Sequence, residues 1–181
     1  MGKNIKLKLY LFIFFLIACA HPSYYLDKNE VHKIKKVAIF PFHNLSKTPQ
    51  AREIVTQIFL AELTKANLFN IEELGNIIDF MVEKRLRIGA SLDKASLLLL
   101  RRRYKVDAII LGDILVFDER GGVPYLNLTA RMVSTDTGKI IWKASIERNG
   151  EDYIKVLNIG RISSLNQLTQ RVIKELIETM S

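Results

Sequence analysis

The stretch from Val106 to Glu147 constrains the fold most, because it has the pattern of three successive strands joined by two tight turns. Val106 to Phe117 is a long apolar run rich in β-branched residues, which predicts a strand. Gly121-Gly122 suits a hairpin turn that needs positive φ angles, and Asp136-Thr137-Gly138 predicts a second turn. Two consecutive hairpins make this part of the sheet antiparallel.

Side chains alternate in polarity after the first turn, as they do in a strand with one buried face. One predicted face carries Leu126, Leu128, Ala130 and Met132, and the other carries Tyr125, Asn127, Thr129 and Arg131. In the third strand, a shared apolar face is predicted for Ile140, Trp142, Ala144 and Ile146. We therefore expect Trp142 in the core, and Asn127, Thr129 and Arg131 on a face open to solvent or to a partner.

The remaining segments complete the order β-α-β-α-α-β-β-β-α. The pattern predicts a buried strand over 36–42, a helix to about residue 66, a short strand over 68–73 and a second helix from 75 or 76. It also predicts a third helix, from Ser91 or Asp93 to Tyr104, and a closing helix over about 162–180. The fold class expected is α/β (α+β), with helices packed on a mixed sheet whose C-terminal strands are antiparallel.

The N-terminus has the features of a targeting segment. Three lysines precede Leu9–Ala18, an apolar run of ten residues. That length lies within the roughly 7–15 residues of a signal-peptide core and is far below the ~20 of a membrane-spanning helix. The run ends in Leu16-Ile17-Ala18-Cys19, which resembles the lipobox of bacterial lipoproteins. The resemblance implies cleavage between Ala18 and Cys19, lipid on Cys19, and, because residue 20 is Ala rather than Asp, the outer membrane in preference to the inner one.

Removal of this leader leaves one domain's length of chain and lowers the net charge from +8 to +5. That modest charge argues against nucleic acid as a partner. The predicted organisation is a signal peptide over 1–18, a lipidated tether over 19–35 and a single domain over 36–181. A tether of about sixteen residues would span up to ~55 Å. Cys19 is the only cysteine, so no intramolecular disulfide can form.

No catalytic, cofactor or metal set is found in the sequence. His43 has no second ligand at metal spacing, and Asp107 and Asp113 would need a cleft to act as an acid–base pair. Asp107 is better explained as marking the entrance of a strand. The densest basic run is Arg101-Arg102-Arg103 with Lys105. It fits a helix C-terminus or a patch that faces lipid headgroups, lipopolysaccharide phosphate or an acidic partner.

Three segments together resemble the CsgG/TolB-N-terminal-like lipoprotein domains. Lys36–Ser46 is similar to that family's V-A-V-hydrophobic-P-F-x-N opening, and Val106–Asp113 to its V-D-A strand. Leu126–Trp142 is similar to its L-x-x-R…T-G…W hairpin, whereas the arginine that usually leads its helical segment is absent here. The resemblance covers roughly residues 35–178. Its members share a fold but not one activity.

We therefore expect a periplasm-facing lipoprotein that acts without catalysis as an interaction or assembly module of the cell envelope. Its membrane contact would be the N-terminal lipid, and its protein partner is not named by the sequence. Two alternatives follow from the resemblance: a subunit of a curli-type secretion pore, and an activator of a cell-wall synthase. A homo-oligomer also stays open, because related domains oligomerise.

Overall fold

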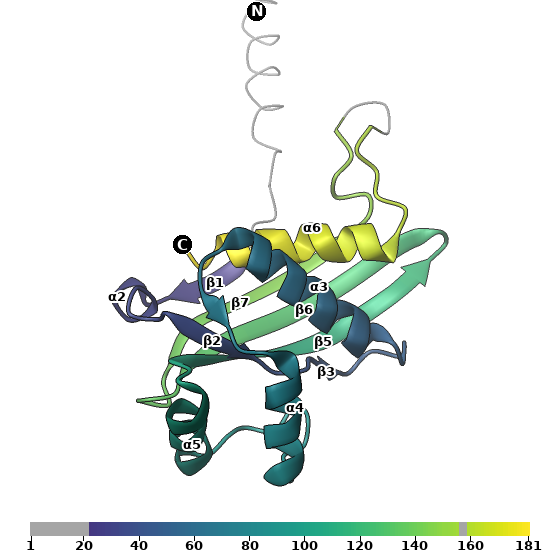
Figure 1. The fold of residues 1–181 in the computed structure, drawn as a ribbon. Helices are drawn as coiled ribbons and strands as arrows, with labels where there is room; N and C mark the ends of the chain where they lie inside the picture. The colour runs from purple at the N-terminus through teal and green to yellow at the C-terminus, as the bar shows by residue number, and fades with distance from the viewer. Residues whose placement is uncertain (1–21, 156–158) are drawn as a thin grey trace, which may run out of the picture.

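The computed structural model describes residues 22–155 and 159–181, and these form one mixed sheet with helices on both faces (Figure 1). The seven strands follow the order β1-β7-β6-β5-β2-β4, and β3 also pairs with β5. The strands are β1 (Ser23–Leu26), β2 (Lys36–Ile39), β3 (His43–Asn44), β4 (Asn70–Ile71), β5 (Ala108–Arg120), β6 (Val123–Ser134) and β7 (Ile140–Asn149). The helices are α2 (Lys28–Val31), α3 (Ala51–Ala66), α4 (Leu74–Glu83), α5 (Lys94–Tyr104) and α6 (Leu165–Glu178).

The pairing directions confirm the predicted fold class. β5 pairs with β6, β6 with β7 and β7 with β1, all antiparallel. On its other edge β5 pairs in parallel with β2 and then with β3, and β2 pairs in parallel with β4. From β2 onward the chain follows the predicted element order, with the two-residue strand β3 added.

The segment predicted as a tether is folded from Ser23 onward, so that part of the prediction is wrong. β1 pairs with β7, with Ser23 opposite Ser145 and Leu26 opposite Trp142. Asp27 caps α2 by accepting the Glu30 N–H at 3.2 Å. The polar composition of this segment concealed an edge strand whose partner lies more than a hundred residues away. The preceding residues 19–21 lie outside the described part of the chain.

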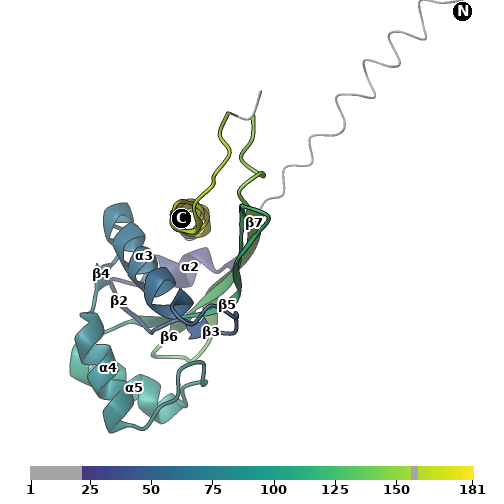
Figure 2. The same ribbon diagram turned by 90° about the vertical axis from the view of Figure 1, so that its right-hand side faces the viewer.

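Two hydrophobic cores lie on opposite faces of the sheet. In Figure 2, α3 and α6 lie above the sheet and α4 and α5 lie below it. The larger core fills the space between α3, α6 and the whole breadth of the sheet, and it includes Phe42, Trp142 and Leu176. The smaller core, which includes Phe80 and Leu100, lies between α4, α5 and the part of the sheet around β2. One face of β5, β6 and β7 is therefore only partly covered by helices.

The predicted turns and the alternation of β6 are confirmed. Gly121 and Gly122 have φ angles of 57° and 76°, and Gly138 has a φ of 72°. Every residue predicted on the apolar side of β6 is buried, whereas Asn127, Thr129 and Arg131 are half-buried on the other side. Asp93 caps α5 by accepting the Ser96 N–H at 2.8 Å.

The predicted apolar face of β7 is wrong at its first residue. Met132 is opposite Trp142, but Val133 is opposite Ile140, so Ile141 is an extra residue in the ladder. A bulge of this kind resets the alternation of side chains. As a result Ile141 and Trp142 are both buried, whereas Ile140 is 44% exposed. Trp142 is fully buried, which confirms it as a core residue, and its indole N–H donates to Thr179 Oγ1 at 2.9 Å.

A close contact with Gly112 fixes the crossing of the chain from β2 to β3. The Phe42 ring packs directly on Gly112, where a Cβ atom would overlap the ring. Phe42 cannot easily move away, because it is fully buried and its ring centroid lies 5.1 Å from that of Phe59. Gly112 is therefore required by packing rather than by its backbone angles.

We expect Gly112→Ala to destabilise the protein by about 1–3 kcal/mol, because the added methyl must displace a buried ring. The matched control is Gly75→Ala, since a Cβ at Gly75 would meet its nearest atom at 3.9 Å. In a helix this second change should be neutral or stabilising by up to about 1 kcal/mol. Urea unfolding of the two variants measures the difference, and equal midpoints would contradict the packing argument.

Candidate functional site

The candidate site is the sheet surface opposite α3 and α6, which we call the outer face. The helices α4 and α5 cover only part of this surface, where Ile109, Leu111 and Val133 lie beneath them. The outer face is the part of the sheet surface that these two helices do not cover. Figure 1 shows α4 and α5 confined to the β2 side of the molecule. The outer face consists of His43 on β3, Asp113 on β5, Tyr125, Asn127, Thr129 and Arg131 on β6, and Lys143, Ser145 and Glu147 on β7.

Asp113 is the centre of a polar network on this face. One carboxylate oxygen, Oδ2, accepts from Arg131 Nη1 at 3.3 Å and from Thr129 Oγ1 at 3.4 Å. The other, Oδ1, lies 3.3 Å from His43 Nδ1. Strand pairing causes this arrangement, because β3 places His43 opposite Asp113 and β6 places Thr129 opposite it on the other edge. The side chains of Asp113 and Arg131 keep 24% and 27% of their surface exposed.

A second polar pair extends the network across β6 to β7. Asn127 Nδ2 donates to Glu147 Oε2 at 3.0 Å, and the two residues are cross-strand partners. The Asn127 Oδ1 atom is buried without a hydrogen-bond partner among the described residues. The outer face thus carries both signs of charge, held in place by neighbouring side chains.

The segment over 85–92 borders the outer face at His43. Gly89 has a φ of 84°, and a Cβ there would lie 2.6 Å from the His43 ring. Only a glycine lets this segment approach the ring so closely. The loop therefore limits the movement of His43 and defines one end of the outer face.

The structure brings together the three predicted face residues, Asn127, Thr129 and Arg131. Sequence reasoning missed His43 and Asp113 as members of the same site. Asp107 belongs elsewhere: its Oδ2 accepts the backbone N–H groups of Lys35 and Lys36, each at 3.0 Å, as expected for a strand entrance. The one available signal was that Asp113 is the only acid within the apolar run of β5.

The predicted basic run occupies the last turn of α5. Arg101 lies 3.4 Å from Asp136, and Arg103 pairs with Glu83 at 2.5 Å. Hydrogen bonds from Lys84 and Arg103 hold the pKa of Glu83 below its usual range. Lys105 follows as the left-handed C-cap, with a φ of 58°. The position at a helix C-terminus is confirmed, while binding of headgroups or an acidic partner by Arg101, Arg102, Arg103 and Lys105 stays a prediction.

A groove that the sequence did not indicate lies between α3 and α4. It has a volume of about 560 Å³ and is lined mainly by apolar side chains, with Arg52 and Glu53 at its α3 side. Val82 in α4 is 73% exposed at this groove. Nothing in the described part of the chain covers it.

Lipid attachment at Cys19 with cleavage after Ala18 concerns residues outside the described part of the chain and stays a prediction. Within 22–155 and 159–181, no helix is both long and apolar enough to cross a membrane. In the same residues no cluster of three or more His, Cys, Asp or Glu side chains is placed to hold a metal ion.

No protein-family model matches this chain, and no curated protein matches its sequence. Solved structures do share its fold. The PelC dodecamer from Paraburkholderia phytofirmans has a TM-score of 0.61 at 14% identity, covering 86% of this chain and 93% of that one. The lipoprotein GNA1162 from Neisseria meningitidis has a TM-score of 0.53 at 14% identity, covering 80% and 99%. The protein CT253 from Chlamydia trachomatis has a TM-score of 0.55 at 9% identity, covering 81% and 95%. At these identities the similarity concerns the fold.

If the Asp113 network orders the outer face, loss of its charge should weaken the fold measurably. We expect Asp113→Asn to lower the free energy of unfolding by about 1 kcal/mol, because Arg131 and His43 lose the carboxylate that they share. The cost is small because both side chains are partly exposed to water. Asp79→Asn is the control, since Asp79 is exposed on α4 away from this face. Chemical unfolding compares them, and equal stability of both variants would remove the network's structural role.

Proposed function

We propose that this chain is a periplasm-facing lipoprotein, anchored by lipid on Cys19, whose domain binds a partner protein through the outer face without catalysis. The observation that carries the proposal is the uncovered sheet surface with its ordered polar side chains. A surface in which Arg131, Asp113 and Asn127 already have fixed partners loses less conformational entropy when a partner docks.

The charges of the outer face indicate what such a partner needs. Lys143 and Glu147 are exposed on β7, and Arg131 lies beside them on β6. A complementary surface therefore carries both acids and bases, which gives specificity and register more than raw affinity. This mixed pattern favours a folded protein surface over a polyanion such as nucleic acid.

Membrane anchorage is supported by the leader and the lipobox-like Leu16–Cys19. Residue 20 is alanine, which favours the outer membrane. The similarity of the fold to the lipoprotein GNA1162 is consistent with an envelope location. Several acyl chains on one cysteine would give stable anchoring, which a single chain does not.

Replacement of Cys19 by Ser should release the protein from the membrane or leave its leader uncleaved, while the domain stays folded. Membrane fractionation and the mass of the N-terminal peptide measure the two effects. The control is Ser23→Ala, a change of similar size just after the lipid site. Normal processing and full membrane retention of Cys19→Ser would contradict the anchor.

A photoactivatable phenylalanine at Tyr125, which is half-buried on the outer face, should cross-link to one discrete partner in intact cells. The same residue at Leu68, which is exposed between α3 and β4, should not. Arg131→Glu should abolish the cross-link by breaking the Asp113 pair and reversing a charge. Lys174→Glu on α6 makes the same charge change on the opposite side of the sheet and should leave it intact.

The mass of the cross-linked product separates two kinds of partner. A product of twice the chain mass would support assembly of identical copies, which the description of the structurally similar PelC as a dodecamer favours as a second candidate. A different mass would support an envelope protein. No product from Tyr125, or equal capture from Leu68, would contradict docking at the outer face.

A further inference from the structure

The folded β1 strand brings the predicted anchor close to the sheet. Residues 20–22 separate Cys19 from Ser23, so the link can span at most about 14 Å. We infer that the β1 edge, with Tyr24 and Tyr25, lies against the surface of the phospholipid bilayer that holds the lipid on Cys19. This inference rests on the lipidation of Cys19 in the proposed function.

Two aromatic side chains are exposed on this edge. Tyr24 and Tyr25 have 60% and 55% of their surface accessible, among the most exposed large hydrophobic side chains of the described residues. Because successive side chains of a strand point to opposite faces, the two rings flank the edge from both sides. Tyrosine has an apolar ring and a polar hydroxyl, the combination that is enriched at membrane–water interfaces.

The outward edge of β1 also has no strand partner in the described chain. β7 occupies one side of β1, and the sheet ends there. Such an edge offers unpaired backbone groups, and proteins generally keep it short or cover it. β1 is short, with four residues. Water and phosphate oxygens of a bilayer headgroup region can form hydrogen bonds with its unpaired backbone groups.

Exposed lysines lie beside the tyrosines. Lys143 is the cross-strand partner of Tyr25, and Lys28 begins α2 just after the strand. The two acids of the segment over 23–35 are engaged: Asp27 caps α2, and Glu30 pairs with Lys33 at 2.6 Å. This edge is therefore suited to a surface that contains anionic lipids.

Contact at β1 sets the height of the outer face above the membrane. Neighbouring strands are about 4.8 Å apart, so Thr129, two strands from Ser23, lies about 10 Å further along the sheet. Even with the link between Cys19 and Ser23 fully extended, Thr129 lies within about 25 Å of the bilayer. The partner must then present its binding surface within that distance of the membrane that holds the lipid.

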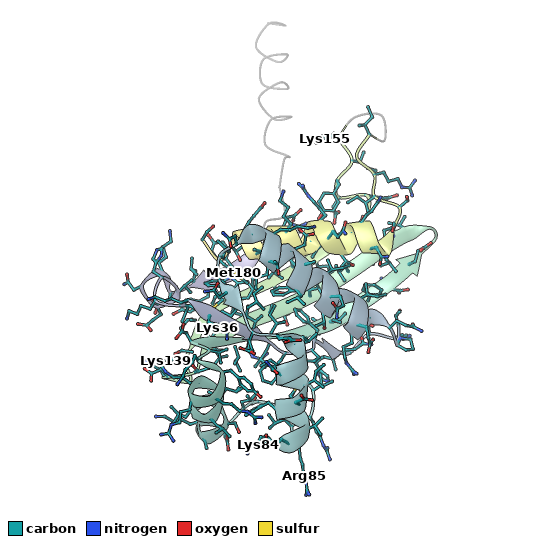
Figure 3. The ribbon with its side chains drawn as sticks, in the orientation of Figure 1. Lys36, Lys84, Arg85, Lys139, Lys155 and Met180 are labelled. Atoms are coloured by element: carbon teal, nitrogen blue, oxygen red, sulfur yellow. The ribbon has the colours of Figure 1, made fainter. Side chains whose placement is uncertain are left out.

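Environment-sensitive fluorescent labels on single introduced cysteines test the inference. In the lipidated protein the Cys19 sulfur is consumed by its thioether, so Tyr24→Cys or Tyr25→Cys is the only free thiol. Lys84→Cys is the control, because Lys84 follows the last residue of α4 and lies at the other end of the molecule from β1 (Figures 1 and 3). Each labelled lipoprotein is reconstituted into phosphatidylethanolamine–phosphatidylglycerol vesicles with or without a doxyl-lipid quencher, after its acyl mass has been verified.

We expect labels at residues 24 and 25 to shift to shorter emission wavelength and to lose fluorescence with the doxyl lipid, while the label at residue 84 does neither. Equal quenching at all three positions, or none, would overturn the inference. A wavelength shift without lipid quenching would show that a second copy covers the edge, and would also overturn it. A missing acyl mass would defeat the proposed anchor itself, whereas an acylated protein without quenching would defeat only the membrane contact.

Discussion

The pairing of β5 on both of its edges is the interaction on which the rest of the structure depends. It joins the antiparallel hairpins to the parallel strands β2 and β3. Its side chains alternate between the two cores: Ile110 packs beneath α3 and α6, and Ile109 packs beneath α4 and α5. At Asp113 the second layer of helices has ended. The first part of β5 is thus covered by helices on both faces, and the part from Asp113 onward is covered on one face only. The outer face starts at Asp113.

The edge strand β1 connects the predicted lipid anchor to the sheet that carries the outer face, two features that the sequence presented as separate. The lipid was expected to hold the domain at the end of a long tether, and the sheet was expected to start at Lys36. Since β1 extends the sheet beyond β7, the described chain begins beside the outer face, three residues after the predicted lipid site. The proposed anchor therefore restricts how the proposed binding surface is presented as well as where the protein resides.

Part of the candidate site could be predicted from local sequence. Asn127, Thr129 and Arg131 were found because β6 has one buried and one open face, so its polarity alternates. Asp113 and His43 were not found. The first half of β5 is buried on both faces and is apolar at consecutive positions, which hides the alternation. His43 reaches Asp113 only through parallel pairing of strands 70 residues apart.

By itself the sequence determined the resemblance to a leader and lipobox, the two hairpins, the helices from α3 onward and the mixed α/β class, because each depends on periodicity, turn chemistry or capping within a few residues. Tertiary structure alone decided the pairing of β1 with β7, the bulge that buries Ile141 and exposes Ile140, and the network around Asp113. These depend on which strand lies beside which and on how far the helices extend over the sheet. Such long-range choices are made by the packing of the whole domain, which no local pattern records.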